Sequence, residues 1–334
     1  MTQPLRVGIL GAARIAERAV VHPARANGAQ IAAVAARDLA RAQAYATRHG
    51  IPKAYGSYDD LLADPEIDLV YNPSPNSEHV RWTLAALRAG KLVLSEKPFA
   101  ANAAQARLVA AEATAGRVFE GFHHRYHPVH RRLLELVGSG AIGEVTELSV
   151  NMKFDCTDLG DIRWSWPLAG GSLMDLGCYH LHVAKDVAAA LGGRLTLEGC
   201  ATTTHPEADP RVDATARVTG KLPGGGDVVL ESSLVEPEDF SVLVTGTRGT
   251  IRQPALIRPS ADDRLIVTID GTETTEYHGT ISTYTHQFAA LTASIRRGVP
   301  FPTDLANAIE IMDLLDQCYT LAGLPLRESE PTAH

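Results

Sequence analysis

Short apolar runs alternate with helical stripes over the first third of the chain. Five mostly apolar runs suit strands that are buried on both faces: residues 5–10, 31–36, 68–72, 91–95 and 118–122. Helical spacing follows most of these runs, as in the segment between Asp38, a capping residue, and Gly50, a terminating one. This alternation predicts a parallel sheet covered by helices, with ligands at the carboxyl ends of the strands.

Proline and asparagine mark two further helix boundaries in this region. The helix after the first strand is expected to run to about Val21 and to be interrupted at His22 and Pro23, because proline disfavours the helical state of the preceding residue. Another helix is expected from about residue 103 to residue 115, with Asn102 as its cap.

The pattern changes near residue 123. Residues 146–155 alternate strictly between apolar and polar positions, and Ala214, Ala216 and Val218 repeat this alternation. These segments predict a mostly antiparallel sheet up to about residue 277, crossed by a helix from about 173 to 191, and two amphipathic helices follow it. The expected fold is therefore an α/β Rossmann domain followed by an α+β domain with an open, mostly antiparallel sheet.

These patterns divide the chain into three parts. We expect a dinucleotide-binding domain at 1–122, a substrate and oligomerisation domain at 123–280, and C-terminal helices at 281–334 that pack back towards the Rossmann domain. No helix in the sequence obviously covers the second face of the open sheet. A like sheet from another subunit could cover it, which predicts a homodimer or homotetramer.

Composition narrows the classes of partner. The chain has 334 residues, 45% of them hydrophobic, and a net charge of −8 without a lysine or arginine run, which argues against nucleic acid and membrane partners and leaves a small-molecule substrate. The first strand begins almost at the N-terminus, which leaves no room for a signal peptide, and no apolar run reaches membrane-spanning length. Four widely spaced cysteines fit free thiols in a reducing compartment, so we expect a cytoplasmic protein.

The first strand leads into a turn of small residues. Gly11, Ala13 and Ala16 stand where the dinucleotide fingerprint places its three small residues, and only the first of them is a glycine. Such a turn lets a pyrophosphate approach the backbone and the N–H groups at the start of the next helix. Small residues also occur at strand-to-helix corners that bind nothing. The residues expected to contact the cofactor here are Gly11, Ala12, Ala13, Arg14 and Ile15.

The end of the second strand bears on the choice of cofactor. An NAD site usually has an acidic residue there for the ribose hydroxyl, whereas this chain has Ala36 followed by Arg37. A guanidinium without a neighbouring carboxylate favours the 2′-phosphate of NADP(H), although NAD(H) remains compatible. The alternative is that Arg37 is a solvated loop residue before the Asp38 helix cap.

Two segments carry candidate acid–base groups. Glu96-Lys97-Pro98 closes the strand at 91–95, where Lys97 could hydrogen-bond or protonate an alcohol oxygen. In the helix at 173–191, Asp175 and Tyr179 lie four residues apart on one face, which His182 and Asp186 continue. That stripe is either the solvated side of the helix or a site in which Asp175 holds a hydroxyl and Tyr179 moves its proton.

Histidines crowd just beyond the first domain. His123, His124, His127 and His130 follow one another closely, with Arg125 among them. No carboxylate stands with them at a known ligand spacing, and neighbouring histidines rarely all converge, so we expect no metal site. Hydrogen bonding to a substrate is the alternative that we favour.

Several motifs in order carry a family resemblance. They are the small-residue turn, Pro75-Asn-Ser-Glu-His79, Glu96-Lys97-Pro98, Arg125-Tyr-His-Pro128 and Gly170-Gly-Ser-Leu-Met-Asp-Leu-Gly-Cys-Tyr179. Over nearly its whole length the chain resembles the glucose-fructose oxidoreductase, inositol dehydrogenase and MocA family. Where many relatives have histidine, this chain has Tyr179, which makes it similar to the NADP-using dihydrodiol dehydrogenase and sugar oxidoreductase branch.

The resemblance implies hydride exchange between a nicotinamide cofactor and a secondary alcohol or ketone of a sugar, polyol or dihydrodiol. It implies that Lys97 is the catalytic lysine, Asp175 its acidic partner and Tyr179 the general acid/base. Further cofactor contacts are expected from Pro73, Asn76, His79, Glu96 and Lys97. Substrate contacts are expected from Arg125, His124, Trp164 and His180.

Two other functions remain open on the same fold. One is a regulator that senses the nucleotide without catalysis, since the family includes a repressor. The other is an enzyme that keeps its cofactor bound while it oxidises one sugar and reduces another.

Overall fold

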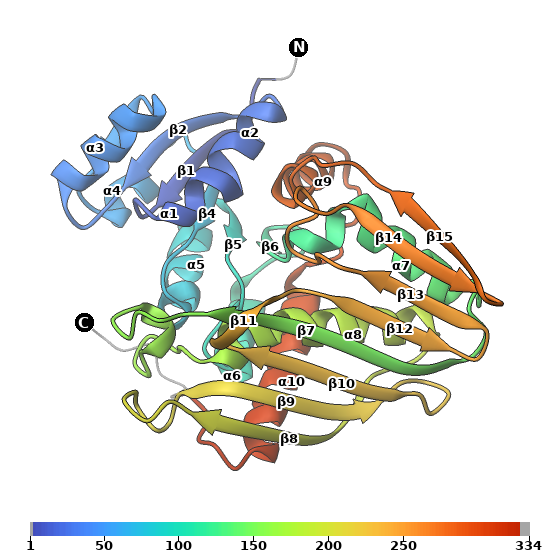
Figure 1. Cartoon of the computed structure of the whole chain (residues 1–334). Helices are drawn as coiled ribbons and strands as arrows, with labels where there is room; N and C mark the ends of the chain where they lie inside the picture. Colours follow the sequence, from blue (N-terminus) through green and yellow to red (C-terminus); the bar gives the residue numbers. More distant parts are fainter. Residues whose placement is uncertain (1–2, 328–334) are drawn as a thin grey trace. The chain divides into compact units, whose positions relative to one another are not determined.

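The computed structural model describes residues 3–327, which form two compact units (Figure 1). The first unit comprises residues 3–122 and 284–310, and the second comprises 123–283 and 311–327. The predicted C-terminal part, 281–334, is thus shared between the two units, and its last residues, 328–334, lie outside the described part of the chain.

A six-stranded parallel sheet forms the centre of the first unit. Its strand order is β3-β2-β1-β4-β5-β6. The bounds are β1 Arg6–Leu10, β2 Gln30–Ala35, β3 Lys53–Tyr55, β4 Leu69–Asn72, β5 Leu92–Ser95 and β6 Val118–Glu120. The order reverses between β1 and β4, so the carboxyl ends of these two strands flank the crevice where such sheets bind ligands.

The helices of this unit lie between the strands along the chain, and all but α2 and α4 fall in segments that were expected from the sequence to be helical. The bounds are α1 Arg14–Ala16, α2 His22–Ala26, α3 Leu39–His49, α4 Tyr58–Ala63, α5 His79–Arg88 and α6 Ala103–Glu112. Two predicted caps are confirmed, because the side chain of Asp38 accepts a hydrogen bond from the N–H of Ala40 and that of Asn102 accepts one from the N–H of Gln105.

The predicted interruption at His22 and Pro23 is wrong. A π-helical turn over Glu17–Val21 joins α1 to α2, so the chain stays helical through the proline. The N–H of His22 donates to the carbonyl of Glu17 in the π-helical pattern. Pro23 stands in the first turn of α2, where a residue needs no N–H to form that helix's own hydrogen bonds. The change of hydrogen-bond pattern accommodates the proline without ending the helix.

A late segment completes the edge of this sheet. Helix α9 (Thr283–Arg297) is one of the two predicted amphipathic helices, and it buries Phe288 and Leu291, which lie three residues apart on one face. Beyond it, the N–H of Glu120 in β6 donates to the carbonyl of Thr303 at 2.8 Å, and the Thr303 hydroxyl donates to the carbonyl of Glu120 at 2.7 Å.

The second unit is built on a nine-stranded sheet. Its order is β15-β14-β13-β12-β7-β10-β9-β8, and β11 pairs with β7. The bounds are β7 Val145–Asp155, β8 Thr196–Thr204, β9 Asp213–Lys221, β10 Asp227–Ser233, β11 Val235–Asp239, β12 Val242–Gly246, β13 Gly249–Gln253, β14 Arg264–Ile269 and β15 Thr272–Tyr277. Only β7 and β10 pair in parallel among these ladders, so the sheet is mostly antiparallel.

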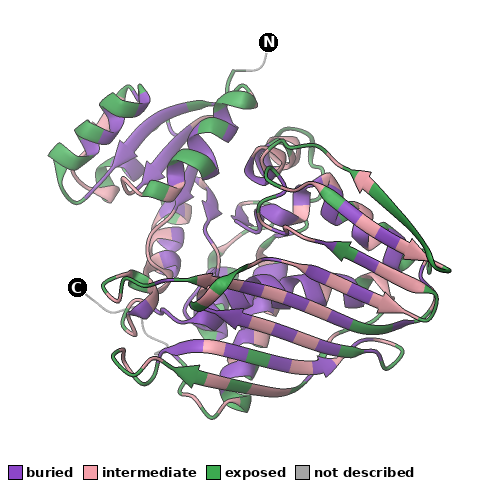
Figure 2. Ribbon diagram, viewed as in Figure 1, coloured by how far each residue is buried: buried purple, intermediate pink, exposed green. Residues whose placement is uncertain are grey.

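Helices cover one face of this sheet. Helix α8 (Cys178–Ala190) packs on β7 and β10, and α7 (Pro128–Gly138) packs on β13 and β14. The buried residues of the covered face alternate with half-buried or exposed ones along the strands (Figure 2); Leu148, Val150 and Met152 of β7 are fully buried. A π-helical turn over Leu173–Gly177 leads into α8, and helix α10 (Leu305–Leu321) enters this unit at residue 311.

A buried carboxylate fixes the start of the turn before α8. Asp213 of β9 accepts hydrogen bonds from the Ser172 hydroxyl at 2.9 Å, the N–H of Leu173 at 2.6 Å and the Tyr319 hydroxyl at 3.0 Å. A Cβ on Gly171, whose φ is +125°, would collide with Asp213, so the close approach requires glycine. Asp213 thereby joins the sheet, α10 and the π-helical turn that leads into α8.

Candidate active site

The turn after β1 has the form that a dinucleotide phosphate needs. Gly11 has a φ of +114°, and its N–H donates to the carbonyl of Ala35 at 2.8 Å. A Cβ at this position would lie 3.2 Å from the Tyr58 hydroxyl, so the backbone is kept bare where a phosphate would rest. Ala13 has an extended conformation (φ −85°, ψ 140°) that any residue adopts, which explains why alanine replaces the second fingerprint glycine. The turn therefore fits a nicotinamide dinucleotide.

Two arginines lie beside this turn. Arg37 directly follows Ala36 at the end of β2 and is exposed. Arg41, in the first turn of α3, is also exposed and donates to the carbonyl of Ala12 at 3.2 Å. Burial raises the pKa of Tyr58, and the charges of both arginines oppose that rise, so both guanidinium groups act on the phenol that faces Gly11.

Arg41 and Tyr58 were not predicted from the sequence. Arg41 could have been found as a cation at the start of a helix, where the helix dipole favours acidic residues. Tyr58 follows Ser57, whose side chain accepts a hydrogen bond from the N–H of Asp60 and begins α4. That helix and β3 were both missed, because β3 has three half-buried residues and no clear alternation.

The loop after β4 is tied to the segment that carries Lys97. The ring of His79, which is 1% exposed, lies with Nδ1 2.7 Å from the carbonyl oxygen of Pro98. Burial lowers the pKa of His79 to about 4, so the ring is neutral at physiological pH. His79 therefore braces the loop, and the contacts to a cofactor expected from Pro73, Asn76 and His79 remain predictions.

Glu96 holds the backbone around Lys97. It is 9% exposed, and its Oε1 accepts a hydrogen bond from the Tyr71 hydroxyl at 2.7 Å. Its Oε2 accepts one from the N–H of Lys97 at 3.3 Å. Burial raises the pKa of Glu96, while Tyr71 and the charge of Lys97 oppose the rise. The half-buried Lys97 follows β5 at the carboxyl edge of the parallel sheet, and the Lys97–Pro98 peptide is cis.

The stripe on the helix of the second unit is buried. Tyr179, His182 and Asp186 are 4%, 1% and 8% exposed, so the alternative that this stripe is the solvated side of the helix is wrong. The Tyr179 hydroxyl lies 3.0 Å from Nε2 of His123. Asp175 is half-buried, and its Oδ2 accepts a hydrogen bond from Nε of Arg163 at 2.7 Å.

The rings of His123 and His124 both lie against Tyr179, and those of His130 and His182 lie against His124. The ring centroid of His124 lies 5.4 Å from that of Tyr179, 5.2 Å from that of His130 and 5.0 Å from that of His182. Burial lowers the pKa values of His130 and His182 to about 4 and about 3. In the described part of the chain, no group of three or more His, Cys, Asp or Glu side chains could hold a metal ion.

The four residues expected to contact a substrate contact other protein groups or are buried in this structure. Arg125 pairs with Asp186 at 2.6 Å, and His124 and His180 are fully buried. Burial lowers the pKa of His180 to about 3. The indole N–H of Trp164 donates to the carbonyl of Cys156 at 3.0 Å. Their contact with a substrate stays a prediction.

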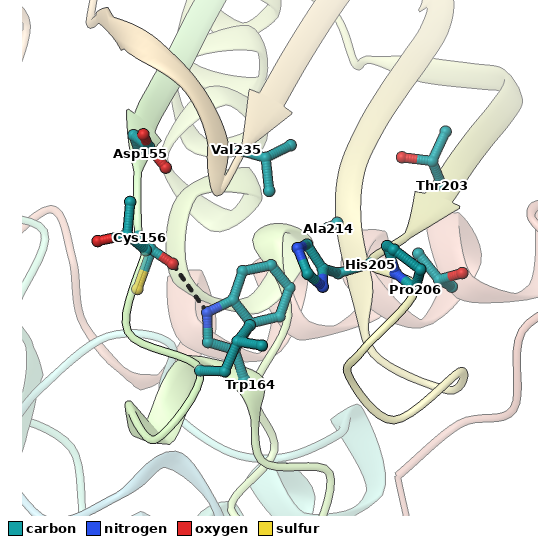
Figure 3. A pocket seen from close by; sticks show the side chains of 11 residues that line it. Asp155, Cys156, Trp164, Thr203, His205, Pro206, Ala214 and Val235 are labelled. Carbon is teal, nitrogen blue, oxygen red and sulfur yellow. Dashed lines mark hydrogen bonds between the residues drawn. The ribbon is translucent and has the colours of Figure 1, made fainter.

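Trp164 lines a cavity of about 380 Å³ in the second unit (Figure 3). The ring of His205 lies 5.4 Å from the indole, centroid to centroid, and Asp155, Ala214 and Val235 contribute from strands β7, β9 and β11. Tyr179 and Asp175 are not among the residues that line this cavity.

A parallel dinucleotide domain with a glycine turn, followed by a mostly antiparallel sheet, defines the class of two-domain dinucleotide-binding proteins. Residues 5–122 match the model of an oxidoreductase family with an NAD-binding Rossmann fold, and residues 130–252 match that of the GFO/IDH/MocA C-terminal domain. The chain belongs to the GFO/IDH/MocA family of oxidoreductases.

Named relatives and solved structures agree with this membership. The chain is 36% identical to a D-xylose 1-dehydrogenase (NADP(+)) of Haloferax volcanii over 94% of this chain and 96% of that protein. It is 35% identical to the trans-1,2-dihydrobenzene-1,2-diol dehydrogenase of Bos taurus over 66% of this chain and 64% of that protein. A 3-ketoreductase of Actinomadura kijaniata, solved with NADP and TDP-benzene, superposes with a TM-score of 0.86 at 25% identity, over 96% of this chain and 98% of that one.

Proposed function

We propose that this chain is an NADP(H)-dependent oxidoreductase that exchanges hydride with a secondary alcohol or ketone of a sugar, polyol or dihydrodiol. Relatives that are named as an NADP(+)-dependent xylose dehydrogenase and as dihydrodiol dehydrogenases support the substrate class. The observation that carries the choice of cofactor is the pair Arg37 and Arg41 beside the Gly11 turn, together with Ala36 at the position where an NAD site would have a carboxylate.

The chain's own residues divide the chemistry between them. When bound, the nicotinamide supplies or accepts the hydride. In the oxidative direction Tyr179 would take the hydroxyl proton and Lys97 would donate a hydrogen bond to the same oxygen. Asp175 would hold the alcohol in line, with Arg163 fixing the carboxylate at 2.7 Å. Reduction reverses each of these steps.

Replacement of Lys97 tests this assignment. Lys97→Met should retain NADPH binding and lose turnover by about 10²- to 10⁴-fold, the usual contribution of a positioned proton donor. Lys221→Met is the matched control, because Lys221 pairs with Asp227 on the surface. The assay is nicotinamide absorbance across a panel of aldoses, polyols, dihydrodiols and ketones. Unchanged turnover in Lys97→Met would remove this lysine from the mechanism.

The same preparation separates two other functions of the fold. A cofactor that copurifies and is reduced and reoxidised without release would indicate sugar-to-sugar exchange. NADPH binding without turnover on any member of the panel would indicate a nucleotide-sensing regulator.

The open sheet supports a proposal about assembly. A row on the face opposite α8 crosses five strands: Val229, Ser149, Leu243 and Ile266 are half-buried, and the exposed Arg252 of β13 lies between Leu243 and Ile266. We propose that a second copy of the chain covers this row in a homodimer or homotetramer. No described helix is long and apolar enough to cross a membrane. The four free thiols support the further proposal that the protein works in the reducing cytoplasm.

A further inference from the structure

A chain of three buried polar side chains ends at the Tyr179 hydroxyl. The Nε2 atom of His123 lies 3.0 Å from the Tyr179 oxygen, and its Nδ1 atom lies 2.7 Å from the Thr283 hydroxyl oxygen. His123 and Thr283 are each 2% exposed, and Tyr179 is 4% exposed. The three residues come from separate segments of the second unit: the 3-10 helix His123–Tyr126, the start of α9, and α8.

The two hydrogen bonds that join these three side chains can run in either of two donor-to-acceptor directions. A neutral imidazole has one N–H donor and one acceptor nitrogen, whereas threonine and tyrosine hydroxyls can donate or accept. If Thr283 donates to Nδ1, the proton of His123 resides on Nε2 and is donated to the tyrosine oxygen. The phenolic proton of Tyr179 is then directed away from His123. In the opposite direction, Nδ1–H of His123 donates to Thr283, and the Tyr179 hydroxyl donates its proton to Nε2 of His123.

We propose that His123 is a positioning residue for Tyr179: its Nε2–H, fixed by Thr283, orients the phenolic proton and stabilises the phenolate. This inference rests on the proposed role of Tyr179 as acid and base. During ketone reduction the O–H bond of Tyr179 breaks and an O–H bond forms on the substrate oxygen, which has received the hydride. The phenolate that remains accepts the Nε2–H hydrogen bond until a proton from water restores the phenol.

The other histidines near this pair are neutral. The ring of His124 lies 6.4 Å from that of His123 and 5.4 Å from that of Tyr179. Burial lowers the pKa of His124 well below its usual value, and His182 and His130 lower it further. His182 of α8 and His130 of α7 are themselves buried with lowered pKa values. His124, His130 and His182 are therefore neutral near pH 7, and the carboxylate of Asp186 pairs with Arg125 at 2.6 Å and with Lys185 at 3.2 Å.

Three variants test the inference through the pH dependence of alcohol oxidation. His123→Phe removes both hydrogen bonds, and the rising limb of the kcat profile should move to higher pH by about one unit or more, since a hydrogen bond to a charged group is lost. His123→Gln keeps an N–H donor and should restore part of the shift. Thr283→Val removes only the group that fixes the tautomer and should give a smaller shift in the same direction.

A matched control and a second readout make the result decisive. His49→Gln replaces a buried histidine of α3 whose ring lies against Tyr45 in the first unit, and its pH profile should stay unchanged. In the cofactor-free protein, the ring Cζ resonance of Tyr179, assigned by its loss in Tyr179→Phe, should titrate at higher pH in His123→Phe than in the wild type. If both the kcat profile and this resonance are unmoved in His123→Phe and His123→Gln, the inference is overturned.

The fate of the Tyr179→Phe variant separates this inference from the proposed function. If Tyr179→Phe loses turnover and the double variant with His123→Phe is no slower, His123 acts through the tyrosine as inferred. If Tyr179→Phe turns over normally, the proposed role of Tyr179 is wrong and the inference falls with it. If Tyr179→Phe is inactive but the histidine variants have wild-type pH profiles, only the inference is wrong.

Discussion

The arginines beside the Gly11 turn make a quantitative prediction about cofactor choice. A hydrogen bond to a charged group is worth about 1.5–3 kcal/mol, and exposure of Arg37 and Arg41 reduces this to about 1–1.5 kcal/mol for each contact with a 2′-phosphate. Each Arg→Ala replacement should therefore weaken NADPH binding about fivefold to tenfold. Arg41 commits only one of its five N–H groups to the carbonyl of Ala12, so its effect should match that of Arg37.

The assay is titration calorimetry with NADPH and NADH on Arg37→Ala, Arg41→Ala and the double variant. NADPH affinity should fall about 25- to 100-fold in the double variant, while NADH affinity should change less than twofold. Arg48→Ala, in the last turn of the same helix, is the control and should bind both cofactors normally. Equal losses for NADPH and NADH would refute the 2′-phosphate role of the two arginines.

Three further predictions concern stability and assembly. The folded protein keeps His130 and His182 neutral, so below the usual histidine pKa of about 6.5 the unfolded chain binds protons that the folded chain does not. The free energy of unfolding should therefore fall by about 2 kcal/mol per histidine from about pH 7 to about pH 5. Urea denaturation midpoints that stay the same over this range would contradict the prediction. Asn102→Ala should lower the free energy of unfolding by about 1 kcal/mol because the N–H of Gln105 loses its cap, which urea denaturation checks. Leu243→Arg should shift sedimentation towards the monomer, and an unchanged coefficient would exclude this face as the interface.

The sequence predicted the elements whose residues repeat with a clear period. The parallel strands are apolar runs, and β7 alternates, so both patterns report burial directly. β3 and α4 were missed because they are short, and the proline of α2 was misjudged because a π-helical turn leaves no mark in the pattern of apolar residues.

The contacts between side chains in the candidate site could not be predicted from the sequence, for a different reason. The contact between His123 and Tyr179 joins residues 56 positions apart, and the one between Arg163 and Asp175 crosses a loop whose path the sequence does not specify. The stripe containing Tyr179 reads as polar in the sequence, yet it is buried because histidines from α7 and the 3-10 helix pack against it. In a sequence, polar side chains that form hydrogen bonds with one another in the interior give the same pattern as polar side chains on a solvated surface.

The proposed function requires Lys97 and Tyr179 to act on one substrate oxygen. A crystal structure with NADP⁺ and a bound alcohol tests it most directly. We expect Nζ of Lys97 and the hydroxyl oxygen of Tyr179 both to lie within about 2.6–3.2 Å of the same alcohol oxygen. A structure in which the two groups face separate cavities would contradict it.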